Sequence, residues 1–396
     1  MIRFIFRRLA VMGPMVLLVL TISFFLVRLA PGNPFTREGR QLPDSVLKNL
    51  NEKYGLDEPL YKQYANWIGR VLHFDFGPSI KYPDRNVNEI IGESITVSAS
   101  IGIFAYFIAL LVGLSGGVLA GYKKNSWADY LSSTVSVLGV SVPNFILGPL
   151  LVLVFSLTLY WLPPARIEWL AIAGPIDLHW LIVIFSVVVI AIYIALVYLG
   201  LGGVLLRIVS PLTHGNKKIS YAILGSTGLA GLFVIVFLLR PYLHWQGVSF
   251  PLSIKIPSLR SIILPAVTLS AVYIAYIMRL TRSGMVETLG RDYIRTARAK
   301  GLSERRVIFV HALRGAVLPV VSFTGPALAG LIGGTVVVEK IFAIPGLGSY
   351  FINAAFNRDY FLLLGITAFV STLLMLMNLL VDITYAIIDP RIRFER

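Results

Sequence analysis

The side chains that usually carry out chemistry in proteins are few in this sequence and widely separated. The chain of 396 residues has no cysteine and five histidines, and no two histidines have the spacing of metal ligands on one helix face. The glycine-rich sequences that bind ATP or dinucleotides are missing. The sequence therefore predicts no catalytic residue, no metal site and no cofactor bound by this chain. The histidines are His73, His179, His214, His244 and His311.

The most informative polar segment is Arg279–Arg314, which contains nine basic residues. Its pattern predicts two short helices that meet at Gly301, because glycine readily adopts the left-handed conformation that ends a helix. Ser303 is a suitable N-cap for the second helix, and the small side chains of Ala297 and Ala299 would let another surface approach. A basic loop on anionic lipid head groups is the alternative interpretation, but lipid contact requires no tight turn.

The elements that must position this segment follow from the composition. Hydrophobic residues make up 56% of the chain and charged residues 14%, whereas soluble globular proteins contain about 25% charged residues. So much apolar surface requires a lipid environment, which excludes a soluble or disordered chain. The net charge of +15 agrees with the enrichment of Lys and Arg in cytoplasmic loops, so nucleic acid is not an expected partner.

Eight stretches without Asp, Glu, Lys or Arg approach or exceed the length of about 20 apolar residues with which a helix spans a bilayer. The third is longer than one span needs and could be a broken helix, since Pro143 and Pro149 lie inside it; it is counted once. Basic residues concentrate in the loops that are cytoplasmic if both termini are cytoplasmic. The eight stretches are Leu9–Val27, Ser94–Tyr122, Tyr130–Ala165, Leu178–Leu206, Ile219–Leu239, Ser261–Met278, Gly315–Val338 and Tyr360–Val381.

This pattern divides the chain into five regions. They are 1–30 with the first span, 31–93 as an extracytoplasmic segment, 94–165 with spans two and three, 166–257 with two further spans, and 258–396 with three spans and the cytoplasmic segment 279–314. The extracytoplasmic segment contains two candidate amphipathic helices, Asp44–Tyr54 and a second that begins after Asp57. They could form a small cap on the spans or a docking surface for an outside partner.

The run Tyr-Ile-Arg-Thr-Ala-Arg-Ala-Lys-Gly-Leu at Tyr293–Leu302 resembles the coupling loop of ABC importer permeases, in the branch that imports peptides. The general pattern of these permeases is Glu-Ala-Ala, three residues and Gly. Ala297 and Gly301 fit it, whereas Arg295 and Thr296 stand where Glu and the first Ala are usual. Four other segments are similar to the first permease subunit of oligopeptide importers. They are Arg7–Leu9 with Arg28–Pro34, Asp75–Ser79, Asn357–Tyr360 and Asp389–Arg391.

The resemblance implies an all-α polytopic membrane protein with a six-span ABC importer permease core and an inserted two-span hairpin within 166–257, about eight transmembrane helices in all. It implies a second homologous permease, two cytoplasmic ATPase subunits that bind ATP and Mg, an extracytoplasmic peptide-binding protein and a place in the lipid of the bacterial inner membrane. The chain would form half of the pathway for a peptide. The coupling residues implied are Asp292, Tyr293, Arg295, Thr296, Ala297, Ala299, Gly301 and Leu302.

Residues that line the pathway are harder to select. Ser270, Tyr273 and Tyr276 are candidates, because they are polar or aromatic residues on the span Ser261–Met278. Nickel or another small solute is the alternative substrate within the family, and an ATP-independent carrier or channel is the alternative outside it. The scarcity of ionisable residues inside the spans disfavours an ion-coupled carrier. The inserted hairpin could be a lipid-facing ornament or a partner-binding appendage.

Overall fold

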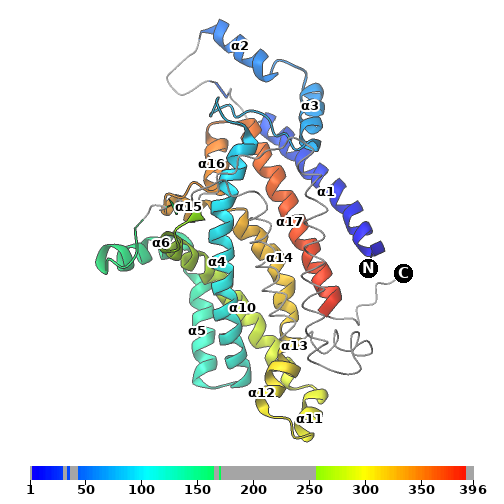
Figure 1. The fold of residues 1–396 in the computed structure, drawn as a ribbon, viewed down its shortest axis with the longest axis vertical. Helices are drawn as coiled ribbons and strands as arrows, with labels where there is room; N and C mark the ends of the chain where they lie inside the picture. The colour runs from blue at the N-terminus through cyan, green and yellow to red at the C-terminus, as the bar shows by residue number, and fades with distance from the viewer. Residues whose placement is uncertain (1, 30–33, 36–42, 165–168, 171–255, 389–396) are drawn as a thin grey trace.

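The computed structural model describes residues 2–29, 34–35, 43–164, 169–170 and 256–388. This part of the chain is an elongated bundle of helices (Figure 1), and its β-structure consists of one pair of two-residue strands and one isolated bridge between Pro78 and Asn86, so the predicted all-α class is confirmed. In chain order the elements are α1 (Ile2–Leu29), α2 (Asp44–Tyr54), α3 (Leu60–Leu72), α4 (Val87–Tyr122), α5 (Trp127–Ser141), α6 (Asn144–Leu151), η1 (Val152–Thr158, a π-helix), β1 (Trp169–Leu170), β2 (Ile256–Pro257), α10 (Leu259–Leu289), α11 (Asp292–Ala299), α12 (Glu304–Arg306), η4 (Val307–Ala312, a π-helix), α13 (Leu313–Ala316), α14 (Leu318–Ile332), α15 (Val336–Ile341), α16 (Leu347–Phe356) and α17 (Tyr360–Ile388).

The apolar helices agree with the predicted spans. Five helical stretches in the described part are long and apolar enough to cross a membrane, and the bent pair of α5 with α6 and η1 makes a sixth if it is one span. The remaining two predicted spans, Leu178–Leu206 and Ile219–Leu239, lie outside the described residues. The five stretches are Ala10–Leu29, Val87–Tyr122, Arg260–Leu289, Leu318–Ile341 and Tyr360–Thr384.

The third predicted span is broken. α5 ends at Ser141, and the chain bends by 103° before the helix of α6 and η1. Val142 is extended, with φ −87° and ψ 110°, and Pro143 follows it. Proline disfavours the helical conformation in the residue before it, which explains the break. Pro149 lies within α6, so only Pro143 of the two prolines marks the bend.

The helices on either side of Arg279–Arg314 begin and end at other residues than the uncharged stretches do. The span that begins at Ser261 continues as helix α10 to Leu289, so the first part of Arg279–Arg314 is helix rather than loop. In the stretch that matches the predicted span Gly315–Val338, α14 ends at Ile332 and Gly334 adopts φ +89° before α15 begins, although Leu318–Ile341 as a whole is long and apolar enough to cross a membrane. Local hydropathy does not register these changes, since helix ends depend on backbone turns and on tertiary packing.

Helices α4 and α10 pack against each other along the centre of the bundle. A Cβ placed on Gly113 or Gly117 would lie 2.8 Å from Ile277 Cβ and 2.5 Å from Thr281 Cβ, respectively, and Gly121 repeats the close contact one turn later. Glycines four residues apart let membrane helices approach closely and gain van der Waals contact, where lipid provides no hydrophobic drive for association. The glycine spacing can be seen in the sequence, but the sequence does not show which helix packs against these glycines.

Two of the short sequence motifs, Asp75–Ser79 and Asn357–Tyr360, contact each other. The predicted topology places this contact at the extracytoplasmic end of the bundle. Asp359, fully buried, precedes α17 and accepts hydrogen bonds from the Ser79 hydroxyl, from the N–H of Lys81 (3.1 Å) and from the N–H of Leu362 (3.2 Å). Residues 280 positions apart are thereby joined, which anchors the segment after α3 to the last span. The bond to Leu362 also satisfies a free N–H at the start of α17.

The helices α2 and α3 form as predicted, but they differ in burial. Trp67 of α3 is buried and stacks on Phe24 of α1 at 5.7 Å between ring centroids, and the Tyr64 hydroxyl lies 2.6 Å from that of Thr21. α2 has no buried residue. The cap interpretation of this segment therefore fits α3, whereas α2 projects beyond the bundle (Figure 1).

The ends of the predicted insertion lie side by side. Strand β1 pairs antiparallel with β2, so that Trp169 faces Pro257 and Leu170 faces Ile256. The chain therefore leaves the described bundle and returns to it at one place. Residues 171–255, which include the predicted hairpin, are outside the described residues.

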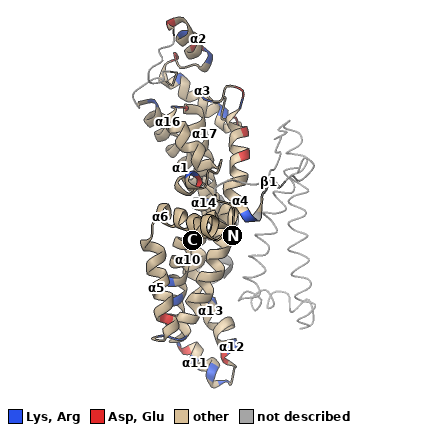
Figure 2. Ribbon diagram, turned by 90° about the vertical axis from the view of Figure 1, so that its left-hand side faces the viewer, with Lys and Arg blue, Asp and Glu red and all other residues tan. Residues whose placement is uncertain are grey.

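Charged residues gather mainly at the two ends of the elongated bundle. Figure 2 shows Lys, Arg, Asp and Glu around α2 and α3 at one end and around α11 and α12 at the other, with few between them. A helical bundle with an uncharged middle and charged ends matches the polarity profile of a bilayer. The segment with the predicted coupling function thus lies at one polar end.

Candidate coupling site

The turn between α11 and α12 has the geometry of a Schellman motif. Gly301 has φ +73°, its N–H donates to the carbonyl of Arg298 (2.9 Å), and the N–H of Leu302 donates to the carbonyl of Ala297 (3.4 Å). These bonds satisfy carbonyl groups that the end of a helix leaves free. The predicted helix–glycine–helix turn is confirmed, and its left-handed residue is the glycine.

One face of α11 holds this turn against the bundle. Ile294 and Ala297, three residues apart, are 0% and 6% exposed and pack in a cluster with Met285 of α10 and with Val307 and Ala312 of η4. Residues at this spacing lie on the same side of a helix. The cluster therefore fixes α11 to α10, one of the long apolar helices.

The opposite face supplies the exposed surface. Ala297 is buried and Leu302 is half-buried against the same cluster, so the expectation that Ala297 leaves room for another surface is wrong. Around Gly301 the space is open, because no atom lies within 4 Å of the position that a Cβ would occupy. The exposed residues among the eight predicted ones are Asp292, Tyr293, Arg295, Thr296, Ala299 and Gly301.

An ion pair closes the turn from the solvent side. Arg298 donates from Nε to Oε1 of Glu304 at 2.8 Å and from a terminal nitrogen to Oε2 at 3.4 Å. This hydrogen bond raises the pKa of the Arg298 guanidinium, because it stabilises the charged form. Ser303 has the extended backbone of an N-cap residue but makes no side-chain cap bond, so its predicted capping is confined to the backbone.

A second ionic contact, which the sequence reasoning missed, lies where α5 begins. Arg282 of α10 donates to both carboxylate oxygens of Asp129 at 2.5 and 2.9 Å, and the N–H of Asn125 donates to the same carboxylate at 3.0 Å. The Asp129 side chain is 5% exposed and that of Arg282 is 34% exposed. A bidentate pair of this kind fixes two helices in orientation as well as distance. The 153 positions between the two residues leave no local signal for it.

The three candidate pathway residues have different environments. Ser270 is fully buried and its hydroxyl donates to the carbonyl of Val267 in its own helix, so it does not line an open path in this structure. Tyr273 is half-buried and Tyr276 is exposed; their rings lie 6.1 and 5.6 Å from that of Phe323 in α14. Only the aromatic pair therefore remains a candidate.

The site is an exposed helix face beside an open glycine turn. Within the described residues, no group of three or more His, Cys, Asp or Glu side chains is placed to hold a metal ion. The exposed face of α11 combines a partly exposed aromatic ring with short polar side chains around an open glycine. This exposed surface is fixed to the long apolar helix α10 through the buried face of α11.

A polytopic helical bundle with this turn at a polar end defines a class of membrane transport subunit, and the chain belongs to the family of binding-protein-dependent transport system inner membrane components. The family matches residues 219–394, and the family of its N-terminal part matches residues 1–80. The chain is therefore a membrane-spanning subunit of a transport system that contains further subunits. The first match begins inside the predicted insertion 166–257, whose role stays a prediction.

Individual relatives extend the match to the full chain. It is 38% identical over 394 residues to the oligopeptide transport system permease protein OppB of Salmonella typhimurium, with all of both chains covered. It is 37% identical over 394 residues to OppB of Haemophilus influenzae, again over both full chains. It is 34% identical over 396 residues to the dipeptide transport system permease protein DppB of Bacillus subtilis, covering all of this chain and 99% of that one.

Proposed function

We propose that this chain is one permease subunit of an ATP-driven importer of oligopeptides or dipeptides. It forms half of the translocation pathway, and a second homologous permease forms the other half. The names of its relatives support a peptide substrate. An extracytoplasmic peptide-binding protein delivers the peptide, and this chain performs no covalent chemistry.

The observation that carries the coupling role is the two-faced helix α11. Its buried face is fixed to α10 through Ile294 and Met285, and its exposed face surrounds Gly301. Two cytoplasmic ATPase subunits, which bind ATP and Mg, hold this face in a surface groove. ATP can drive a change of state only if the face makes different contacts in the two states. Closure of the ATPases then moves α11, and α10 conveys the movement to the apolar helices.

The proposed orientation places both termini and α11 in the cytoplasm of a bacterium, with α2 outside its inner membrane. Because the chain has no cysteine, single cysteines can report this directly. We expect cysteines at Lys124, Arg295 and Lys217 to be protected from an impermeant reagent added to whole cells, and one at Lys48 to be labelled. Lys217 lies outside the described residues, so labelling there from outside would contradict the eight-span topology.

The function is tested in membrane vesicles that contain this chain together with the other subunits of the transporter, expressed from the neighbouring genes. We expect uptake of radiolabelled trialanine that depends on ATP, and ATP hydrolysis that trialanine stimulates. Uptake that persists without nucleotide would favour an ATP-independent carrier or channel. Uptake of radioactive nickel without uptake of peptide would replace the substrate but keep the coupling mechanism.

A further inference from the structure

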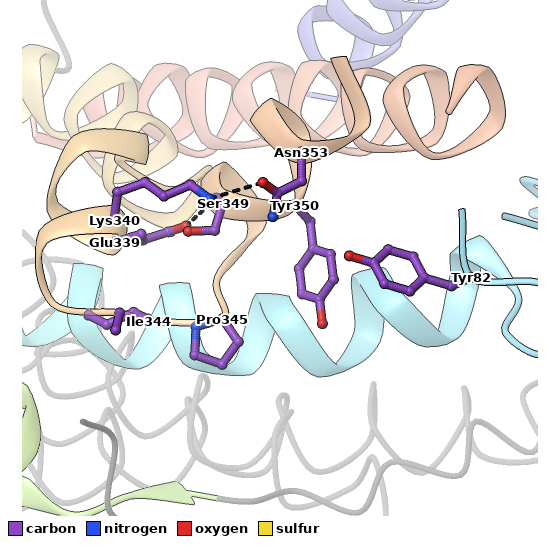
Figure 3. Close-up of a pocket in the computed structure, with 9 residues that line it drawn as sticks. Tyr82, Glu339, Lys340, Ile344, Pro345, Ser349, Tyr350 and Asn353 are labelled. Carbon is purple, nitrogen blue, oxygen red and sulfur yellow. Dashed lines mark hydrogen bonds between the residues drawn. The ribbon is translucent and has the colours of Figure 1, made fainter. Parts of the chain in front are cut away.

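A pocket beside α15 and α16, in the half of the bundle away from the turn between α11 and α12 (Figure 1), has no role in the function argued so far. It has a volume of about 400 Å³ and lies between α15, α16 and the segment that contains Tyr82. Figure 3 shows Lys340 and Asn353 on one side of it and the rings of Tyr350 and Tyr82 on another. Pockets for small ligands have volumes of about 300–1,000 Å³. This one is large enough for the end of a peptide.

The pocket is lined in part by the buried carboxyl group of Glu339, which accepts hydrogen bonds from within the protein. Glu339 is 4% exposed; its Oε1 accepts from the Ser98 hydroxyl (2.9 Å) and its Oε2 from the N–H of Ser349 (2.6 Å). The Ser98 oxygen accepts in turn from the N–H of Leu347 (2.9 Å). Burial of a carboxyl group costs free energy unless it is hydrogen-bonded, and these bonds tie Glu339 to α4 and α16. Glu339 therefore shapes the pocket, and an approaching ligand meets other groups first.

The rim of the pocket carries a positive charge. Lys340 is exposed, and its ammonium donates to Oδ1 of Asn353 at 3.0 Å. No carboxylate of the described residues forms an ion pair with it. Because Oδ1 of Asn353 accepts this bond, the amide NH₂ of Asn353 is left as a second donor. The rim thus offers an ammonium and an amide donor to one anionic group.

Two aromatic rings form a wall beside these donors. The rings of Tyr82 and Tyr350 meet edge to face, with 6.0 Å between centroids and 71° between planes. Tyrosine rings provide rigid apolar surface with a polar end. An apolar side chain next to an anionic group can pack on this wall while the anion stays at Lys340.

We propose that this pocket binds the C-terminal carboxylate of the transported peptide, with Lys340 and Asn353 as its donors and the two tyrosines against the last side chain. The inference rests on the proposed peptide function and adds a site in this chain that reads one end of the substrate. A carboxylate fits better than the peptide's ammonium, because both rim groups donate and the buried Glu339 carboxyl group already accepts hydrogen bonds from Ser98 and Ser349.

The test compares trialanine with trialanine amide, which lacks the terminal charge, in vesicles that contain the complete transporter. The ratio of their half-saturating concentrations is measured for the wild type, for Lys340→Met and for Lys340→Arg. Lys48→Met on α2, also exposed, is the matched control. The same binding protein serves every variant, so its own preference cancels from the comparison.

We expect Lys340→Met to reduce the preference for the free carboxylate by about tenfold, the scale of one charge-assisted hydrogen bond at a partly exposed site. Transport of the amide should be unchanged, and Lys340→Arg and Lys48→Met should keep the preference. Equal losses for both peptides, or no change for either, would overturn the proposed site while peptide transport itself stands. Failure of the wild type to transport either peptide would overturn the peptide function and the site with it.

Discussion

Replacement of Gly301 by valine should uncouple the transporter without removing it from the membrane. The cost comes from the backbone, because Gly301 has φ +73° and an added Cβ would meet no atom within 4 Å. A left-handed conformation costs an L-residue about 1–2 kcal/mol, and a β-branched residue is a rare outlier there. Such a cost changes the population of the native turn by a factor of about 5–30.

Two further substitutions separate backbone strain from side-chain bulk. Asparagine is the residue most often found besides glycine at this position of a helix end, so Gly301→Asn adds a side chain with less strain. Gly290→Ala is the matched control, because Gly290 has φ −80° and an added methyl carbon would lie 3.5 Å or more from its nearest neighbours. We expect coupling to decrease in the order Gly290→Ala, Gly301→Asn, Gly301→Val.

The assay measures three quantities for each variant: the amount of subunit in the membrane, the ATPase subunits that co-purify, and peptide-stimulated ATP hydrolysis. The apolar helices are unchanged, so the first quantity should match the wild type in all variants. Gly301→Val should lose at least one of the other two. If all three quantities match the wild type, this turn is not the coupling element and the lipid-contact interpretation is favoured. If Gly301→Asn is as defective as Gly301→Val, backbone strain is not the cause.

Three other perturbations test the bundle. Gly117→Leu should lower the melting temperature of the purified subunit sharply, because its Cβ would lie 2.5 Å from a Thr281 carbon, whereas Gly92→Ala, with nothing within 4 Å, should not. Asp129→Asn should cost about 2 kcal/mol by breaking a bidentate charged contact; an unchanged denaturation midpoint would contradict a role for that pair. Replacement of 171–255 by Asn-Gly, which favours a tight hairpin turn, should join the paired strand ends and leave ATPase co-purification intact; its loss in an inserted protein would assign the region a structural role.

The features that depend on neighbouring residues could be predicted from the sequence. Spans follow from runs of apolar side chains, and the turn at Gly301 follows from a glycine between two short helical patterns. The break at Pro143 was foreseeable for the same reason, since proline restricts the residue before it. Gly113 and Gly117 also had the right spacing for close helix packing, although the sequence reasoning did not use it.

The burial of individual side chains and their contacts with distant residues could not be predicted from local sequence. Ala297 was expected to face a partner and Ser270 to face the pathway, yet both are buried, because the neighbouring helices decide which side of a helix is covered. The pairs Asp129–Arg282 and Ser79–Asp359 join residues 153 and 280 positions apart, where one sequence contains no local signal.

The sequence by itself determined the all-α membrane class, the approximate positions of the apolar helices that the structure describes and the glycine at the turn between α11 and α12, since each depends on interactions within a few turns of chain. Only the tertiary structure decided which face of α11 is free, that α4 and α10 meet through glycines, and that Lys340 and Asn353 face Tyr82 across one pocket. These arrangements bring together side chains from distant segments, and the energy that selects them comes from packing and hydrogen bonds formed after the helices assemble.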